Sequence, residues 1–215
     1  MARTQTIVRT LCHFDELSDE AKEKARDWWR ECENQDTDTS CTYEDAATIA
    51  DLLGIDLRTR PVKLMNGSTR FDPCIWYSGF SSQGDGACFE GTYRYRKGAL
   101  AAVKAHAPTD TKLHQIAKDL QDAQRKAFYC LTASCSHSGR YYHSGCMSVS
   151  VDLESEHYID PTCEAEEDIR DALRAFADWI YSQLEAEYEY RMSDENVDES
   201  IRLNEYEFTE DGGPA

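Results

Sequence analysis

The sequence predicts an α+β fold in which an antiparallel sheet is covered by helices. Segments with strand-like patterns follow one another in runs, whereas a doubly wound fold would alternate strands with helices. The last third of the chain then contains one long amphipathic helix of acidic composition. Neither an internal repeat nor a clear linker interrupts the chain, so one domain is expected over residues 1–215.

Hydrophobic periodicity and capping residues place the expected elements along the chain. Ser18 and Thr42 suit the starts of two early helices, and Gly54 suits the end of the second. Pro61 marks its strand as an edge strand or an irregular one. Strands are expected at residues 6–14, 55–64, 75–80, 87–95, 132–138, 145–153 and 206–208, and helices at 18–33, 42–53, 97–106, 110–131, 162–192 and 194–204.

Composition indicates a folded chain of the cytosol. Hydrophobic residues make up 40% of the sequence and aromatic residues 11%, which is far from the make-up of a disordered acidic tail. Neither a run of about 20 apolar residues nor a signal-peptide core is present, so a cytoplasmic location and no membrane partner are expected. The nine Cys lack the dense spacing of a secreted disulfide framework, and most should be small buried side chains.

The net charge of −18 is concentrated in one segment. Residues 1–151 hold 20 acidic and 19 basic side chains and form a near-neutral body, whereas residues 152–215 form an acidic helical segment and tail. Within the latter, residues 152–211 hold 21 acidic side chains against four Arg. The negative electrostatic field of this segment attracts basic surfaces and repels nucleic acid and anionic membranes, so direct nucleic-acid binding is not expected.

Residues 162–192 predict a helix with an apolar seam and a carboxylate-rich surface. The apolar residues recur at spacings of three and four, which places them on one face. This seam consists of Ile169, Leu173, Phe176, Ile180, Leu184 and Tyr188. The carboxylates expected to bind a basic partner are Glu164, Glu167, Asp168, Asp171, Asp178, Glu185 and Glu189. They could equally form an ordinary solvated helix face, and both interpretations stay open at this point.

The stretch Ser78–Gly91 (SGFSSQGDGACFEG) contains a glycine-rich loop. Its four Gly indicate positive φ angles or close backbone approach. One interpretation is a tight turn between two strands, with Asp85-Gly86 as the hairpin signal. The other is a loop that binds a small polar ligand such as a nucleotide signal. The possible ligand-binding residues are Gln83, Gly84, Asp85, Gly86 and Cys88.

Residues 85–89 (DGACF) also resemble the nucleophile motif of OTU-type cysteine proteases, and His157-Tyr158 resembles their histidine strand. A thiolate needs a nearby imidazole to lower its pKa, which such a pair would provide. In that family the Cys opens a helix, whereas Phe89, Tyr93 and Tyr95 alternate here as in a strand. We therefore assign no catalytic residue and expect a protein that is not an enzyme.

Cys and His residues cluster on the hairpin expected at residues 132–153. Two ligands from each strand could converge on tetrahedral zinc, but the spacing matches no standard zinc motif and suits an ordinary hairpin equally well. The cluster consists of Cys130, Cys135, His137, His143 and Cys146. We assign no metal site from this pattern and expect no cofactor.

Three segments resemble a group of phage and prophage proteins. They are residues 14–26 (FDELSDEAKEKAR), the loop 82–86 (SQGDG) and the tail 204–212 (NEYEFTEDG), so the resemblance covers most of the chain. Proteins of this group are commonly labelled antitoxins of a toxin–antitoxin stability system. The resemblance implies a phage or mobile-element origin, for which inhibition of host defence is an expectation by analogy.

These features lead to one hypothesis and three alternatives. The hypothesis is a phage-encoded accessory protein that inhibits a host defence nuclease or nucleoprotein effector of CRISPR or restriction type. Its acidic helix would occupy the basic nucleic-acid cleft of that protein, with carboxylates in the place of phosphates. The alternatives are a small-ligand binder that uses the glycine-rich loop, an antitoxin-like binder of a basic toxin, and a cysteine hydrolase.

Overall fold

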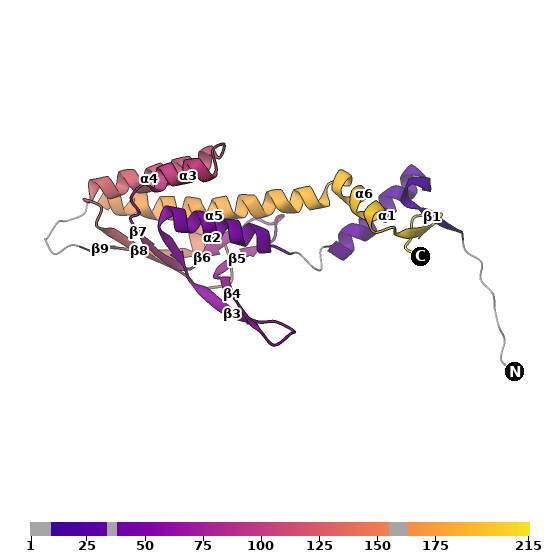
Figure 1. Cartoon of the computed structure of the whole chain (residues 1–215), viewed down its shortest axis with the longest axis horizontal. Coiled ribbons are helices and arrows are strands. Elements are labelled where there is room, and N and C mark those ends of the chain that lie inside the picture. The colour runs from indigo at the N-terminus through magenta and orange to yellow at the C-terminus, as the bar shows by residue number, and fades with distance from the viewer. Residues whose placement is uncertain (1–9, 34–37, 155–162) are drawn as a thin grey trace. The chain divides into compact units, whose positions relative to one another are not determined.

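The computed structural model describes residues 10–33, 38–154 and 163–215 and confirms a mixed fold of helices and antiparallel strands (Figure 1). These residues group into two compact units. Unit 1 joins Met1–Asp38 with Ala186–Ala215, and unit 2 comprises Thr39–Glu185. This differs from the single expected domain with a division after residue 151. The reason is that the first and last segments of the chain pair with each other and share a core of their own.

Unit 2 is built on a four-stranded antiparallel sheet. Its strands lie in the order β2 (Ile55–Leu57), β7 (Gly91–Arg94), β8 (Leu131–His137) and β9 (Met147–Leu153). Along β8, buried Leu131, Ala133 and Cys135 alternate with more exposed polar residues. One face of the sheet therefore belongs to the core and the other faces water.

Helices cover the core face of this sheet, as the sequence predicts. They are α2 (Ser40–Leu53), α3 (Ala99–His106), α4 (Thr111–Lys126) and α5 (Cys163–Met192). Their buried residues share one cluster with those of the strands. α2 ends at Gly54, where φ is 87° and an added Cβ would lie 2.3 Å from the Arg94 carbonyl oxygen. A glycine is therefore required for the chain to pass directly from α2 into β2.

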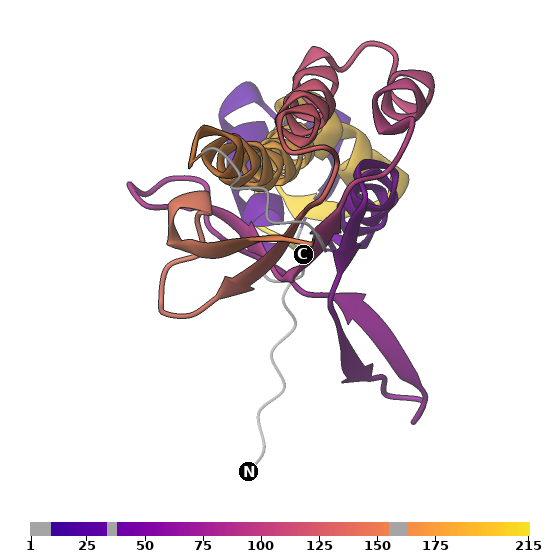
Figure 2. The same cartoon turned by 90° about the vertical axis from the view of Figure 1, so that its left-hand side faces the viewer.

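β2 belongs to a sheet edge that a hairpin interrupts. β5 (Ile75–Ser78) pairs with β6 (Gly86–Phe89) as β2 pairs with β7, so β2 and β5 follow each other along one side of residues 86–94. Between them, β3 (Thr59–Lys63) and β4 (Thr69–Pro73) form a hairpin that projects from the rest of unit 2 (Figure 2). The strands expected at 55–64 and 87–95 are thus two strands each. β4 was not predicted from the sequence. Its first three residues are exposed, so it has no buried face that would require alternating apolar residues.

Unit 1 is small and is closed by its chain ends. β1 (Leu11–His13) pairs with β10 (Glu207–Thr209), and α1 (Asp19–Glu33) packs with α6 (Asp194–Leu203). A 3-10 helix at Phe14–Glu16 follows β1, where the sequence predicts a continuing strand; residues 6–9 of that strand lie outside the described residues. The unit 1 core consists of Phe14, Leu17, Ala21, Ala25, Val197, Ile201 and Phe208.

Two expectations drawn from composition can be compared with this fold. The Cys side chains that the structure describes are all free thiols, but only Cys74, Cys88 and Cys135 are buried, so the expectation of mostly buried Cys holds in part. None of the helices in the described ranges has the length and apolar content that crossing a bilayer requires.

Candidate functional site

The apolar seam of α5 packs into the core of unit 2. Ile169, Leu173 and Phe176 are fully buried, and the Phe176 ring lies 5.5 Å from Phe89 and 5.8 Å from Trp179. Further along, Ile180 and Leu184 are buried and Tyr188 is half-buried. The seam predicted from the spacing is confirmed, and it fixes which side of α5 is left for solvent.

The seven carboxylates expected to bind a partner lie together on the other side of α5. At about 100° per residue they fall within an arc of roughly 100°, opposite the seam. We call six of them, all in unit 2, the acidic face: Glu164, Glu167, Asp168, Asp171, Asp178 and Glu185. Asp168 and Glu185 are half-exposed and the other four are exposed. The seventh, Glu189, is exposed on the part of α5 that belongs to unit 1.

One end of the acidic face is partly neutralised from within the chain. The Lys126 ammonium group at the end of α4 lies 2.9 Å from Glu164 and 2.8 Å from Asp168, and these two carboxylates raise the pKa of Lys126 to about 12. α4 is held beside α5 by a hydrogen bond of 2.8 Å from the Trp179 indole to Asp110. These contacts are structural, so Glu164 and Asp168 are the weakest candidates for binding a partner.

The middle of the acidic face has no such ion pair, although the Lys112 ammonium group lies 3.2 Å from Ser182 Oγ on the same side of α5. Among the described residues, Glu167, Asp171 and Asp178 have no ion-pair partner. Arg170, although on the same helix, lies towards β9: it donates to Glu166 at 2.9 Å and to the Val149 carbonyl at 3.4 Å. Unscreened like charges on one helix face destabilise the helix slightly. They also leave the carboxylates available to a basic protein.

The glycine-rich loop connects β5 and β6, and its carboxylate is used within the loop. Asp85 Oδ2 accepts hydrogen bonds from the backbone N–H groups of Ser81 and Ser82 at 3.0 and 2.6 Å. Gln83 and Gly84 are exposed, and Gly84 has a φ of 108° with no atom near the position of its missing Cβ. This geometry is that of a turn that supports itself. Binding of a ligand by this loop stays a prediction.

Cys88 lies in β6 and is fully buried. Burial raises the pKa of its thiol to about 12, which disfavours the thiolate that a nucleophile requires. Phe89 and Tyr93 belong to strands, as their alternation predicts, and no helix begins at Cys88. His157, the partner expected in a cysteine hydrolase, lies outside the described residues.

The Cys and His residues of the β8–β9 hairpin do not gather around one point. No group of three or more His, Cys, Asp or Glu in the described ranges is placed to hold a metal ion. Cys146 Sγ lies 3.3 Å from His143 Nε2 in a 3-10 helix at Ser144–Cys146. Cys135 is buried, and the His137 ring packs against Tyr142 at 5.1 Å. Cys135 and His137 therefore contribute to the packing of the hairpin.

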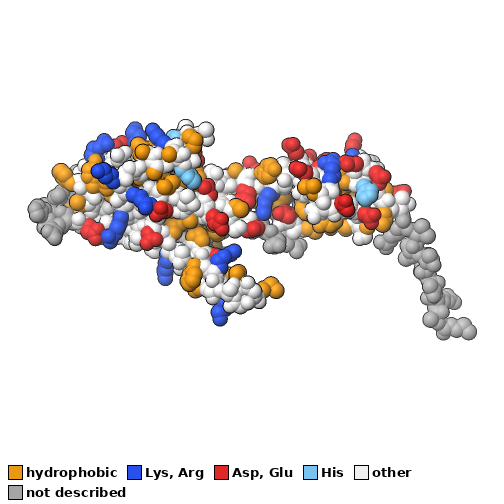
Figure 3. All heavy atoms as spheres, in the orientation of Figure 1, with side chains coloured by type: hydrophobic (Ala, Val, Ile, Leu, Met, Phe, Trp, Pro, Cys, Tyr) orange, Lys and Arg blue, Asp and Glu red, His pale blue; other side chains and the backbone are white. Residues whose placement is uncertain are grey.

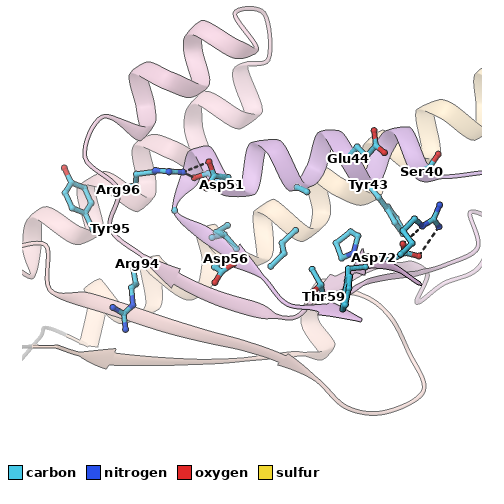
Figure 4. A pocket seen from close by; sticks show the side chains of 17 residues that line it. Ser40, Tyr43, Glu44, Asp51, Asp56, Thr59, Asp72, Arg94, Tyr95 and Arg96 are labelled. Carbon is cyan, nitrogen blue, oxygen red and sulfur yellow. Dashed lines mark hydrogen bonds and ion pairs between the residues drawn. The ribbon is translucent and has the colours of Figure 1, made fainter. Parts of the chain in front are cut away.

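A groove of about 690 Å³ lies beside β2, and no sequence pattern predicts it. α2 forms one wall with Tyr43 and Ala47, and the β3–β4 hairpin forms another with Phe71. Figure 4 shows Tyr43 and Glu44 on α2, with Asp56 and Thr59 on the strands beside it. The groove combines a sheet edge, a helix and a hairpin, elements whose meeting depends on the tertiary fold, so local sequence patterns do not reveal it.

One family model, described as a domain of unknown function (DUF8835), matches residues 39–194, which is more than half of the chain. The chain belongs to this family. The family domain begins at the same residue as unit 2 and includes the acidic face, the glycine-rich loop and the groove. No curated protein and no solved structure is significantly similar to the chain.

Proposed function

We propose that this chain is a non-enzymatic, phage-encoded inhibitor that binds the basic nucleic-acid cleft of a host defence nuclease or effector. The binding surface is the acidic face of α5. The observation that carries the proposal is the row of exposed carboxylates at Glu167, Asp171 and Asp178, which form no ion pair with the described residues. The phage origin rests on the resemblance of three sequence segments.

The geometry of α5 suits a cleft that holds nucleic acid. From Glu164 to Glu185 the acidic face extends over about 30 Å of helix. Carboxylates along this length accept charge-assisted hydrogen bonds from Lys and Arg, the same side chains that bind phosphates. The buried seam behind them holds α5 against the sheet, so the carboxylates are presented by a rigid element. A rigid surface loses less conformational entropy on binding.

Charge reversal of the three unpaired carboxylates tests the proposal. The variant Glu167→Lys, Asp171→Lys, Asp178→Lys changes the net charge from −18 by six units. The matched control, Glu195→Lys, Glu199→Lys, Glu210→Lys, makes the same change at exposed residues of unit 1. In bacteria that carry a CRISPR or restriction system, we expect the wild type and the control to restore phage plating and the α5 variant to fail.

The partner is identified by affinity capture from the same cells at about 0.1 M and about 0.5 M salt. A nuclease or effector captured at low salt and released at high salt supports the proposal, because salt screens exposed charge pairs. Capture of a small basic toxin instead would make the chain an antitoxin that uses the same face. Restored plating with the α5 variant would contradict the proposal.

A further inference from the structure

The edge of the sheet along β2 and β3 has backbone groups without a strand partner. The hydrogen bonds of Arg94 N–H to Gly54 O and of Arg58 N–H to Glu90 O fix which residues of β2 face β7. In an antiparallel ladder the intervening residues point the other way. The backbone N–H and C=O groups of Ile55 and Leu57 therefore face outwards, and β2 is an outermost strand of its sheet.

The same alternation continues into β3. Hydrogen bonds of Cys74 N–H to Arg58 O and of Leu64 N–H to Ser68 O place the even-numbered residues of β3 towards β4. Thr59 and Pro61 therefore face outwards. Pro61 has no N–H, which protects that part of the edge from pairing with another chain. The outward groups of Leu57 and Thr59 have no such protection, and both residues line the groove, whereas Ile55 is only 2% exposed and belongs to the core.

The charges that line the groove leave a negative balance beside this edge. Arg96 pairs with Asp51 at 2.7 Å, and Arg70 pairs with Asp72 at 2.5 Å. Glu44 on α2 and Asp56 on β2 are exposed and, among the described residues, have no ion-pair partner. Arg94 lies at one end and contacts Glu154 at 3.5 Å. The two unpaired carboxylates favour a cationic occupant.

We propose that the groove binds an extended, cationic segment of a partner protein, which adds a strand to the β2–β3 edge. The segment pairs its backbone with Leu57 and Thr59. Alternate side chains of an added strand face opposite sides. Those towards α2 meet Ala47 and Tyr43 and are apolar, whereas the one beside Asp56 is Lys or Arg. The recognised pattern is thus apolar–basic–apolar. The site stands independently of the acidic face.

The hairpin beside the groove adds apolar contact area. Phe71 is 66% exposed and Met65 at the hairpin turn is fully exposed. Figure 3 shows hydrophobic side chains at the tip of this hairpin and basic ones along it. Exposed apolar residues on a projecting element suit contact with the folded body from which the bound segment extends.

A library of short random peptides displayed on phage tests the site, with the purified full-length chain as bait. We expect enrichment of peptides with the apolar–basic–apolar pattern. When a selected peptide is added, we expect perturbed backbone amide signals of Leu57 and Thr59 in nuclear magnetic resonance spectra. Enrichment of acidic peptides, or of none, would overturn the proposal. So would perturbations confined to residues outside the groove.

Two variants separate strand addition from other modes of binding. Thr59→Pro removes one outward N–H at an exposed residue, just as Pro61 lacks one. It should lower the affinity for the selected peptide about tenfold. The matched control Thr69→Pro removes an outward N–H from the opposite edge of the same hairpin and should leave the affinity unchanged. Equal binding to both variants would overturn strand addition.

Charge variants separate this site from the acidic face. Asp56→Lys should lower the affinity for the selected peptide about tenfold, whereas Asp178→Lys should leave that affinity unchanged. Loss of peptide binding in Asp178→Lys with retention in Asp56→Lys would assign the peptide to α5 and overturn the proposal. If two copies of this chain pair through the edge, the particle mass will rise with concentration and Thr59→Pro will abolish the rise, which would also overturn it.

Discussion

The two units of this chain use charge in different ways. In unit 1, acidic residues near the core have basic partners: Arg26 binds Asp198 through two hydrogen bonds of 2.7 and 3.0 Å, and Arg202 binds Asp15 at 2.9 Å. In unit 2, Asp171 and Asp178 on the acidic face have no ion-pair partner among the described residues. Unit 1 also has exposed carboxylates without an ion-pair partner among the described residues, such as Glu195, Glu199 and Glu210, but Asp15 and Asp198 beside its core are paired.

The difference follows from the sizes of the two cores. The unit 1 core is formed by seven buried residues, and small cores provide little hydrophobic stabilisation. It is covered by basic side chains, with the Arg202 guanidinium 5.3 Å from the centre of the Phe14 ring. The unit 2 core extends over four helices and the sheet, so it does not depend on ion pairs. Acidic composition alone therefore does not identify a binding surface, because some carboxylates stabilise the fold through ion pairs.

The largest effect is expected from a substitution in the unit 2 core. Phe176→Ala should lower the free energy of unfolding of unit 2 by about 3 to 5 kcal/mol, because it removes a fully buried ring and leaves a cavity. Denaturant titration followed by hydrogen exchange at the α4 amides measures this. Phe71→Ala, at a ring that is 66% exposed, is the control and should change stability by less than about 0.5 kcal/mol. Equal effects would mean that α5 is not packed as described.

A smaller loss of stability is expected at Gln124, the one buried polar side chain among the described residues. Gln124 donates to the Leu131 carbonyl at 2.7 Å and accepts from the Leu131 N–H at 3.1 Å. Gln124→Leu should lower the free energy of unfolding by about 2 to 3 kcal/mol, because the N–H and C=O groups of Leu131 are left buried without a partner. Gln115→Leu, at an exposed position of the same helix, is the control. A neutral result for Gln124→Leu would show that water reaches Leu131.

The ion pair of unit 1 should give a smaller and salt-dependent effect. Asp198→Asn should lower the free energy of unfolding of unit 1 by about 1 to 2 kcal/mol, since it removes the charge that Arg26 binds at a site less than one-fifth exposed. Hydrogen exchange at the α1 amides should accelerate while that at α4 stays unchanged. Glu199→Gln, at the exposed neighbouring position, is the control. Acceleration at α4 would contradict the separation of the two units.

The smallest expected effects concern the pH at which each unit loses stability. In unit 1, hydrogen bonds from Arg202 to Asp15 and from the Thr209 hydroxyl to Asp211 hold the pKa of each carboxyl below 3.8. Their contribution to stability is present above that value and is lost as the pH falls through the lowered pKa values. We expect hydrogen exchange to show that unit 1 loosens first in acid. Asp15→Asn should reduce this acid sensitivity.

Unit 2 should show the opposite dependence. Burial raises the pKa of Tyr93 and of Cys135 to about 12, so their contribution is complete below the unfolded pKa values and is lost as the pH rises towards 12. Unit 2 should therefore loosen first in alkali, and absorbance of ionised Tyr at about pH 11 would report it. If the same unit opened first at both extremes, the contrast between the cores would be wrong.

The helices were predicted best because their patterns are local. The spacing of Ile169, Leu173 and Phe176 predicts both the existence of α5 and its buried side. The cap at Ser18 and the glycine at position 54 likewise act within a few residues, whereas the start expected at Thr42 is wrong because α2 begins at Ser40. Strand boundaries were predicted less well, because the breaks near Arg58 and Glu90 arise where three segments meet through hydrogen bonds to Cys74.

The sites depend on contacts that the sequence does not reveal. The acidic residues of α5 were predicted as a group. Which of them pair with Lys126 depends on how α4 packs, so the sequence could not predict which carboxylates are left for a partner. The groove beside β2 depends on the register of β2 with β7 and of β3 with β4. Pro61 was the one local signal: it predicts an edge strand, and β3 pairs with β4 alone.

The insertion of unit 2 between the two segments of unit 1 sets an order of events during synthesis. Asp15 and its partner Arg202 are separated by 187 residues. A ribosome makes all of unit 2 before it makes α6 and β10, and domains generally fold as units while the chain emerges. We therefore expect unit 2 to form its core before the two segments of unit 1 meet. The folded unit 2 then shortens the loop that unit 1 must close, which lowers the entropic cost of its late assembly.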